Sequence, residues 1–584
     1  MVKNDLTIVF GGDAGQGIQS SSYGLCQALG RSGLHVFGRQ DYRSQIRGGH
    51  NFHEIRVKDE EILTHRGEAD LLIALTEETV EKHLNEINEG GGVIYEEGFD
   101  FDKGELTARG IKAFPAPLKS IARDEGGSKI MANTAAIGLA AGLTGFDLSY
   151  IDKVIEDNFK KAGKEVVQNN LRVAKAGYNY ADTYNSDFEY ELEAIPDAPK
   201  RMIMDGNEAF VLGAIAGGVN FISAYPMTPS TSIFEGLTKY ANEYEIVTKQ
   251  TESELAAINM AIGAYFTGAR AMVSTSGGGF SLMTEALGLA GMSETPVVIA
   301  EVQRPGPSTG LPTRTEQADL LFTINASQGE FPRLVLTPGT TEEYFRAGAE
   351  AFNLADKYQS PVIVLSDQHL ADSIRTVNPK MIDMESVEID RGNFLSSEDL
   401  DELEERYKRH EFTDSGVSPW APPGHENAVY STTGNEHNEY GEISEDREIR
   451  TKMVDKRERK LESAKKDMIR PGLCGPEDAE YTFISWGSSF GAVKEAANML
   501  SDEGAEVRHC HLGQAWPLPE EDVKSIFENS ENTVVVESNK TSQMGKLIRR
   551  ETGLKSDYSI LRYDGRPLTP DFVVDEFRKI NGGK

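Results

Sequence analysis

The sequence predicts an α/β protein built from three parallel-sheet α/β domains, and three observations support this fold class. Short apolar runs that end at glycine, such as LTIVF at 6–10, are followed by segments with the period of a helix. The segments ADLLIAL at 69–75 and GGVIYEE at 91–97 contain consecutive apolar residues, as expected for strands buried on both faces. The connections between strand and helix signals are short, which favours parallel sheets covered by helices.

The chain has 584 residues, enough for about three to five domains. Residues 1–190 form the first predicted domain, and the acidic, proline-containing stretch at 185–200 is typical of a linker. Residues 200–378 form the second. Residues 379–472 are highly charged and lack buried strand signals, which indicates a connector or interface element. Residues 473–584 form the third predicted domain.

Composition and charge exclude several classes of protein. The net charge of −33 argues against a nucleic-acid partner, because it would repel the phosphate backbone. No run of about 18 apolar residues appears, so we expect no membrane span. The N-terminal sequence MVKNDLTIVFGG lacks the basic region of a signal peptide, and we therefore expect a cytoplasmic protein.

The three cysteines, Cys26, Cys474 and Cys510, are too few and too scattered for an iron–sulfur cluster. A cubane cluster takes four thiolates, and the sequence has no CxxC pair. We interpret these residues as isolated small side chains of the core. The sequence also offers no recognisable metal-ligand set.

A glycine-rich turn, GGDAGQG at 11–17, follows the first strand and precedes a helix. Its glycines (Gly12, Gly15 and Gly17) would let a backbone approach an anionic ligand at the helix N-terminus. The spacing departs from GxGxxG and no acidic partner follows, so a turn that only packs strand against helix is an equal alternative. Three arginines, Arg39, Arg43 and Arg47, lie close in sequence to the glycine pair Gly48-Gly49. They are candidates for binding a phosphate or a carboxylate.

Two further motifs follow strands of the second domain. In AYPMTPST (224–231) two prolines stiffen the loop that carries Thr228, at a strand end where open α/β sheets bind ligands. In QTESELAA (250–257) both Glu252 and Glu254 lie at a helix start. Acidic residues favour that position through the helix dipole alone, so spacing does not assign them a function.

Residues 274–319 are rich in glycine, serine, threonine and proline and lie between two predicted buried strands. Residues of these types rarely form a hydrophobic core. Arg304 follows the strand VVIAEV and enters the loop RPGPSTGLPT. An arginine at the carboxyl end of a strand, followed by stiff hydroxyl-rich turns, suits recognition of a carboxylate.

Together, YPMTPST, ESELAA, TSGGGFSLM and QRPGPSTGLPT resemble the alpha subunit of 2-oxoacid:ferredoxin oxidoreductases, in the same order and at similar intervals. The resemblance covers nearly the whole chain. It implies that residues 1–190 are a gamma-type domain fused in front, that 200–378 are the thiamine pyrimidine-binding domain, and that 473–584 are a transketolase C-terminal-like domain.

The resemblance also implies roles for individual residues. Glu254 matches the glutamate that bonds N1′ of the thiamine aminopyrimidine, which promotes loss of the C2 proton. Its distance from GAYFTGA (263–269) favours it over Glu252. Thr228, Arg304 and Thr313 match positions that hold the 2-oxoacid. The glycine-rich turn and Arg47 are candidates for covering coenzyme A.

Two elements of the family are missing from this sequence: the GDG segment with a following asparagine, which holds magnesium diphosphate, and a four-cysteine set. In the family both lie on a beta subunit. The resemblance therefore implies a site in which thiamine diphosphate is shared with that subunit, which would also carry Mg and a [4Fe–4S] cluster. Coenzyme A is then a co-substrate, ferredoxin the electron acceptor, and the assembly alpha-beta or alpha2beta2.

The family's fused chains favour 2-oxoglutarate or broad 2-oxoacid specificity, with pyruvate as the alternative. Indolepyruvate enzymes are a poorer match, because their alpha chain carries its own diphosphate site and cysteine clusters. A non-catalytic subunit that binds coenzyme A or a nucleotide is the alternative from a different class.

Overall fold

The computed structural model describes residues 2–42, 49–184 and 188–582. The chain divides into two compact units. Unit 1 contains residues 1–204 with 372–381, and unit 2 contains residues 205–371 with 382–584. The predicted α/β class is confirmed in both units. The predicted domain boundaries at 190, 378 and 472 stay predictions.

Over its described residues, the main sheet of unit 1 has eight strands in the order β7-β6-β5-β2-β4-β3-β16-β9. Its first four strands run parallel, whereas β4 pairs antiparallel with both β2 and β3. Residues 42–49 are too few for the crossover that parallel neighbours need, so β3 and β4 are antiparallel. The strands are β2 (Asp5–Asp13), β3 (His35–Asp41), β4 (His50–Lys58), β5 (Ala69–Ala74), β6 (Ile87–Glu96), β7 (Lys112–Ala116), β9 (Met202–Asp205) and β16 (Ile374–Val377), and β1 (Val2–Lys3) pairs apart with β8 (Tyr190–Glu191).

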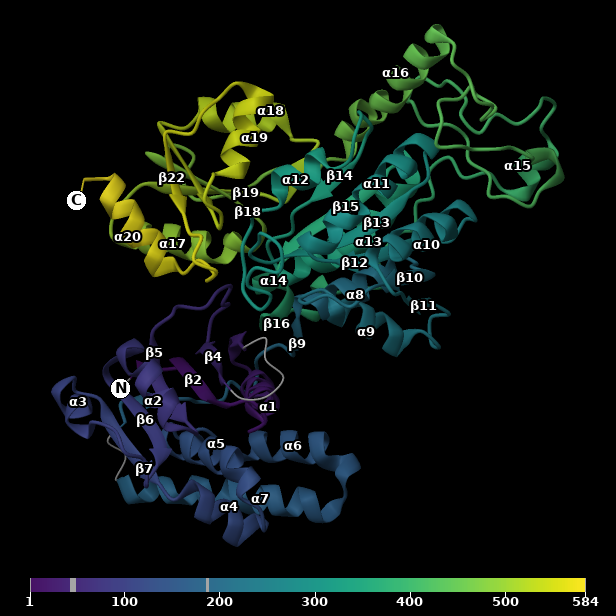
Figure 1. Ribbon diagram of the computed structural model, residues 1–584. Helices are drawn as coiled ribbons and strands as arrows, with labels where there is room; N and C mark the ends of the chain where they lie inside the picture. Colours follow the sequence, from purple (N-terminus) through teal and green to yellow (C-terminus); the bar gives the residue numbers. More distant parts are fainter. Residues whose placement is uncertain (1, 43–48, 185–187, 583–584) are drawn as a thin grey trace. The chain divides into compact units, whose positions relative to one another are not determined.

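Helices cover both faces of this sheet and bury separate apolar clusters. One face packs against α1, α5, α6 and α7, and Figure 1 shows α4 to α7 grouped together on one side of the unit. The other face packs against the shorter α2 and α3. The helices are α1 (Ile18–Arg31), α2 (Glu77–His83), α3 (Lys103–Ala108), α4 (Leu118–Gly126), α5 (Ala132–Leu143), α6 (Leu148–Phe159) and α7 (Lys164–Tyr180).

Unit 2 begins with a sheet of order β11-β10-β12-β13-β15-β14-β20 over the described residues. All pairs are parallel except the last, in which β20 runs antiparallel to β14. Every residue of β13 and β15 is buried, as expected for central strands covered on both faces. The strands are β10 (Phe221–Ala224), β11 (Val247–Gln250), β12 (Ala271–Thr275), β13 (Val297–Gln303), β14 (Leu334–Leu336), β15 (Pro361–Asp367) and β20 (Gln514–Trp516).

The helices of this sheet begin at clear sequence signals. Asp205 and Glu208 form a capping box at α8, and Ser253 caps α10 by accepting from the backbone of Ala256. The apolar α10 and α11 each pack one face on the sheet, and the apolar residues Leu255, Met260 and Leu282 on their other faces are exposed. The helices are α8 (Gly206–Ala216), α9 (Thr231–Tyr240), α10 (Glu254–Phe266), α11 (Gly277–Ser293), α12 (Leu320–Asn325), α13 (Thr341–Tyr358) and α14 (Gln368–Asp372).

The C-terminal part of unit 2 has its own sheet, of order β17-β19-β18-β21-β22 in the described residues, with helices around it. Only β17 runs antiparallel within that set. Its strands are β17 (Gly472–Cys474), β18 (Tyr481–Trp486), β19 (Val507–Leu512), β21 (Asn532–Glu537) and β22 (Tyr558–Leu561), and its helices are α17 (Phe490–Asp502), α18 (Glu520–Glu528), α19 (Gln543–Thr552) and α20 (Pro570–Ile580).

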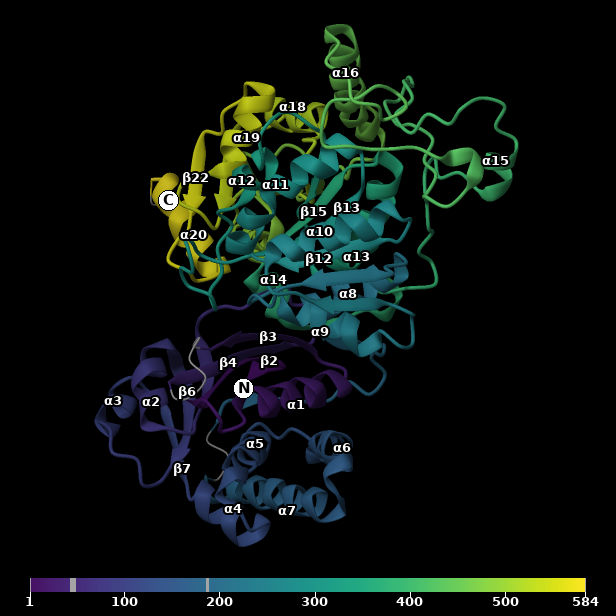
Figure 2. The same cartoon turned by 45° about the vertical axis from the view of Figure 1, so that its right-hand side comes forward.

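The charged segment between the two sheets, residues 382–470, contains α15 (Ser397–Asp401) and α16 (Arg447–Ala464) joined by long loops. Figure 2 shows it as the green part of unit 2, with α15 at its outer end. It buries a small apolar cluster that includes Leu400 and Tyr407, and it inserts Trp420 into the main core of unit 2. The segment is therefore packed onto the domain that precedes it.

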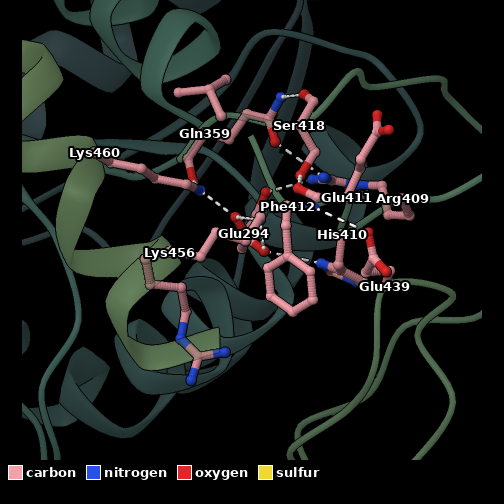
Figure 3. Close-up of polar contacts among 12 residues, drawn as sticks. Glu294, Gln359, Arg409, His410, Glu411, Phe412, Ser418, Glu439, Lys456 and Lys460 are labelled. Atoms are coloured by element: carbon pink, nitrogen blue, oxygen red, sulfur yellow. Dashed lines mark hydrogen bonds and ion pairs between the residues drawn. The ribbon is translucent and has the colours of Figure 1, made fainter. Parts of the chain in front are cut away.

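A buried group of charges holds this segment in place (Figure 3). The carboxylate of Glu294, at the end of α11, accepts from Lys456 Nζ at 2.6 and 2.7 Å and from Lys460 Nζ at 2.5 Å. His410 Nδ1 lies 3.0 Å from the same carboxylate, and Arg409 donates to the backbone oxygen of Glu294. We call these five residues the Glu294 cluster; all five are buried.

The electrostatics of the cluster explain why it does not suit a cation. Glu294, His410 and His437 offer ligand atoms within 4.8 Å of one another. Both carboxylate oxygens, however, already bind lysines, whose charges repel a metal ion. Burial would raise the pKa of the Glu294 carboxyl, but Lys456 and Lys460 hold it well below its usual range. The carboxylate therefore stays ionised as the anchor of the segment.

The replacement Lys460→Met should weaken the pH dependence of stability. Burial lowers the pKa of Lys460 to about 7, against the raising effect of Glu294. Between that value and its ordinary pKa the unfolded chain binds a proton that the folded chain does not, so wild-type stability rises with pH across this window. Over roughly two pH units this gain amounts to about 3 kcal/mol. Urea unfolding of the full chain at two pH values measures it.

The variant should lose most of this gain, whereas the exposed-site control Lys466→Met should keep it. An equal gain in Lys460→Met and the wild type would show that Lys460 is not the titrating group.

Candidate functional site

The predicted site residues of unit 2 gather at one edge of its parallel sheet. Thr228 lies on the loop after β10, Glu254 lies just beyond β11, and Arg304 directly follows β13. These strands run parallel, so their carboxyl ends meet at the same edge. This is the edge at which open α/β sheets bind ligands.

Glu254 is the first residue of α10 and is only 4 % exposed. Its Oε1 atom has no hydrogen-bond partner among the residues that the structure describes. Glu252, the competing candidate, is exposed. A buried carboxylate oxygen without a partner is costly, which indicates that a ligand group completes its hydrogen bonding.

Arg304 and Thr228 are in direct contact. Arg304 Nη1 donates to the backbone oxygen of Thr228 at 2.7 Å, which joins the loops after β13 and β10 across the intervening β12. Burial lowers the pKa of Arg304, but a guanidinium stays protonated at neutral pH. Thr313 is 8 % exposed on the loop that Arg304 opens. The arrangement places the guanidinium of Arg304 and the hydroxyl groups of Thr228 and Thr313 at one edge of the sheet.

Sequence reasoning assigned no role to two acidic residues near this edge, Glu301 and Asp319. Glu301 is fully buried in β13, and Asp319 precedes α12 and donates its backbone N–H to Gln303. The detectable signal was a single carboxylate inside the apolar run VVIAEV. Asp319 lies beside the first turn of α11, where a Cβ on Gly277 would contact its carboxylate.

In unit 1 the glycine-rich turn has the geometry of an anion site. Gly15 and Gly17 have φ of 96° and 73°, values that favour glycine, and Gly17 precedes α1 as an N-cap residue that provides no side-chain hydrogen bond. Asn133 Nδ2 donates to the backbone oxygen of Gln16 and fixes the turn. A Cβ on Gly12 would lie 2.4 Å from Gln16 Oε1, so a larger residue there would displace the Gln16 side chain, which accepts from the backbone of Asp13.

Two cavities adjoin this turn and share Gly15 and Asn133 in their walls. The smaller, of about 260 Å³, is also lined by Lys119 and Lys129. The larger, of about 590 Å³, lies among α1, α5, α6 and α7 and has a mainly apolar lining. Lys119 and Lys129 favour a phosphate-bearing ligand in the smaller cavity, against one acid in its wall, Glu96. Sequence reasoning missed both lysines because they lie far from the turn in the chain.

The arginine cluster predicted beside the turn is only partly described. Arg43 and Arg47 lie outside the described residues. Arg39 is described, and its guanidinium pairs with Asp41 at 3.2 Å and Glu54 at 3.7 Å. Its charge is therefore balanced by neighbouring acids.

The three cysteines are free. The interpretation as core residues is confirmed for Cys26 and Cys510, where burial raises the thiol pKa to about 12. It is wrong for Cys474, which is exposed on the short edge strand β17. None of the helices in the described parts of the chain combines the length and the apolar character that crossing a membrane requires.

Comparison with known proteins identifies the family. Residues 7–180, 212–456 and 479–573 match the families described as "Pyruvate ferredoxin/flavodoxin oxidoreductase", "Pyruvate flavodoxin/ferredoxin oxidoreductase, thiamine diP-bdg" and "Pyruvate:ferredoxin oxidoreductase core domain II". The 2-oxoacid:ferredoxin oxidoreductase subunit alpha of Saccharolobus solfataricus is 33 % identical, over 98 % of this chain and 97 % of the relative. The chain belongs to the 2-oxoacid:ferredoxin oxidoreductase family.

Within this family the chain is an alpha subunit with a gamma-type domain at its N-terminus, as predicted. The 2-oxoglutarate oxidoreductase subunit KorA of Mycobacterium tuberculosis is 30 % identical, over 88 % of this chain and 82 % of the relative. The structure of 2-oxoglutarate:ferredoxin oxidoreductase from Magnetococcus marinus, with 2-oxoglutarate, coenzyme A and succinyl-CoA bound, has a TM-score of 0.93 at 33 % identity, and 99 % of each chain is covered. The fold of the 2-oxoacid:ferredoxin oxidoreductase alpha subunit therefore extends over the whole chain.

Proposed function

We propose that this chain, together with a beta subunit, oxidatively decarboxylates a 2-oxoacid to an acyl-CoA and CO2 and passes the electrons to ferredoxin. 2-Oxoglutarate is the favoured substrate, because the Magnetococcus marinus relative binds it and the Mycobacterium tuberculosis relative is named for it. The observation that carries the proposal is the buried, unpartnered Oε1 of Glu254 at the sheet edge where Arg304 and Thr228 meet.

Glu254 fits the aminopyrimidine end of thiamine diphosphate. Its free oxygen would accept a hydrogen bond from N1′, which would satisfy an otherwise costly buried carboxylate. When bound, the thiazolium of this cofactor supplies the electron sink for decarboxylation. The carboxylate of Glu254 would hold the proton at N1′ and thereby set the tautomer of the ring.

Arg304, Thr228 and Thr313 would bind the 2-oxoacid. The guanidinium of Arg304 can pair with the substrate carboxylate in a two-point contact, while its existing bond to the Thr228 backbone fixes its direction. Holding the carboxylate at one end orients the 2-oxo carbon for attack. The half-buried position of Arg304 strengthens this pairing, because water screens it less.

The beta subunit would supply what this sequence lacks. We assign to it the magnesium diphosphate site and the [4Fe–4S] cluster, since this chain has only three scattered cysteines. The assembly is then alpha-beta or alpha2beta2. The cytoplasmic location stays a prediction from the sequence.

Coenzyme A would bind unit 1, with a phosphate group at the uncapped start of α1 and at Lys119 and Lys129. Lys129→Ala should raise the KM for coenzyme A about tenfold, because one charge-assisted contact is lost. The KM for the 2-oxoacid should stay unchanged. Steady-state kinetics of the two-chain complex measure both constants.

The exposed-site control Lys160→Ala should leave both constants unchanged. If Lys129→Ala has the wild-type KM for coenzyme A, the phosphate does not bind in this cavity.

A substrate panel tests the proposed function. The complex with the native beta subunit should reduce a viologen dye in a reaction that requires coenzyme A, fastest with 2-oxoglutarate. A preference for pyruvate would assign the alternative, a pyruvate:ferredoxin oxidoreductase. No turnover with 2-oxoglutarate, pyruvate or 2-oxobutyrate would favour a non-catalytic subunit that binds coenzyme A or a nucleotide.

A further inference from the structure

The C-terminal part of unit 2 contributes none of the predicted site residues, yet it binds the loop that carries Thr313. This Thr313 loop, residues 304–319, runs from the end of β13 to the start of α12. Thr315 donates its backbone N–H to the oxygen of Gly565 at 3.3 Å, and a Cβ on Gly565 would lie 3.0 Å from Leu311 Cδ1. The segment after β22 therefore contacts the loop on both sides of Thr313 in the sequence.

Gln317, which is fully buried, binds the C-terminal part through both its backbone and its side chain. Its backbone N–H donates to the oxygen of Ser538 at 2.7 Å, and its Oε1 accepts from the N–H of Ser538 at 3.0 Å. Its Nε2 donates to the backbone oxygen of Trp486 at 2.8 Å, and its backbone oxygen accepts from Asn539 Nδ2 at 3.1 Å. One residue thus joins the loop to the carboxyl ends of β18 and β21.

The partners of Gln317 form a preformed receptor for its amide. A Cβ on Gly487 would lie 2.7 Å from Gln317 Nε2, and the φ of 55° at Gly487 favours glycine as well. The fully buried carboxylate of Glu537 accepts from Asn539 Nδ2 at 2.7 Å and from Trp486 Nε1 at 3.1 Å. These hydrogen bonds within the C-terminal part hold the groups that Gln317 contacts.

A second amide holds the end of the loop. Gln543, at the start of α19, donates from Nε2 to the backbone oxygen of Ala318 at 2.5 Å and accepts at Oε1 from the N–H of Leu321 at 2.9 Å. Figures 1 and 2 both show α12 beside α19. Thr315 Oγ1 donates to Asp367 Oδ1 at 3.1 Å, which joins the loop to the end of β15. The loop is therefore attached at several points that follow Thr313.

We propose that Gln317 is a positioning residue for 2-oxoacid binding, and that the C-terminal sheet serves the site by holding the Thr313 loop. Residues 306–311 of this loop are exposed, so its order depends on the attachments that follow. Without them, ordering the loop around each substrate molecule would cost conformational entropy. The inference rests on the proposed role of Thr313 and Arg304 in binding the 2-oxoacid.

Hydrogen exchange of the full chain, measured by mass spectrometry, tests the attachment without activity. Gln317→Met removes the donor and the acceptor of the amide, so backbone amides of residues 305–319 should exchange about tenfold faster than in the wild type. Thr533→Val is the matched control, because it breaks the hydroxyl's 2.8 Å bond to Asp557 near the opposite end of β21. It should leave exchange in the loop unchanged. Wild-type exchange of the loop in Gln317→Met would overturn the proposal.

Kinetics of the two-chain complex test the positioning role. Gln317→Met should raise the KM for the 2-oxoacid about tenfold, with kcat within about twofold of the wild type. The KM for coenzyme A should stay unchanged, and Thr533→Val should leave all three constants unchanged. A fall in kcat without a change in the KM for the 2-oxoacid would indicate a purely structural residue and overturn the role.

The conservative variant Gln317→Glu should restore 2-oxoacid binding at mildly acidic pH. Burial favours the protonated carboxyl group, which can accept from Ser538 and donate to Trp486 as the amide does. The KM for the 2-oxoacid should then approach that of the wild type at the same pH. A KM as high as that of Gln317→Met at every pH would show that these hydrogen bonds do not position the loop.

Two further variants separate this proposal from the proposed function. If Arg304→Ala and Thr313→Val raise the KM for the 2-oxoacid while Gln317→Met does not, the positioning role fails and the substrate site stands. If Gln317→Met speeds exchange in the loop while Arg304→Ala and Thr313→Val keep the wild-type KM, the proposed substrate site fails, and the positioning role with it, but the attachment of the loop stands.

Discussion

Replacement of Glu254 by alanine should reduce 2-oxoacid-dependent dye reduction by about 10²-fold or more in the two-chain complex. The variant removes the carboxylate whose Oε1 lacks a partner in this chain, and with it the group that would hold the proton at N1′. The loss should appear in kcat, because the interaction serves the chemical step and not only substrate binding.

Glu252→Ala is the matched control, two residues earlier in the chain and exposed. It should retain wild-type turnover and the same thermal unfolding temperature as Glu254→Ala. Comparable losses in the two variants would mean that the sheet edge, and not one buried carboxylate, accounts for the effect.

Replacement of Arg304 by alanine should raise the KM for the 2-oxoacid about 10²-fold, since a charge-assisted two-point contact is lost. Arg304→Lys should recover only part of this loss, because an ammonium lacks the planar pair of donors. The KM for coenzyme A should not change in either variant. Initial-rate kinetics with each substrate varied in turn separate these effects.

An equal rise in the KM for both substrates would contradict a specific carboxylate contact. It would instead indicate that Arg304 mainly holds the Thr228 loop through its 2.7 Å bond to the backbone.

Much of the fold followed from the sequence, because apolar strand runs and capping signals act locally. The strands beginning near Leu6, Ala69 and Val297, and the helix beginning at Glu254, are all present. The antiparallel β4 was not predicted, because its sequence HNFHEIRVK mixes charged and polar residues with apolar ones and lacks the apolar run of a buried strand. The family resemblance, and not spacing, singled out Glu254 and Arg304.

The other features could not be predicted because they depend on which charged side chains are buried. The sequence does not indicate this burial. A run such as that around Lys456 and Lys460 is typical of a solvated helix, yet both ammonium groups are buried against Glu294. Lys129 approaches the glycine-rich turn only through the tertiary fold. The acid at Glu301 was visible as an exception in an apolar strand, but Asp319 belongs to a different segment.

The central claim is that the Glu254 carboxylate touches the aminopyrimidine of thiamine diphosphate in the assembled enzyme. The exchange rate of the cofactor's C2 proton with deuterium, measured by NMR on the two-chain complex without substrate, tests that contact directly. Glu254→Gln should slow the exchange by about 10²-fold or more while the complex still binds the cofactor. Exchange at the wild-type rate in that variant would contradict the account.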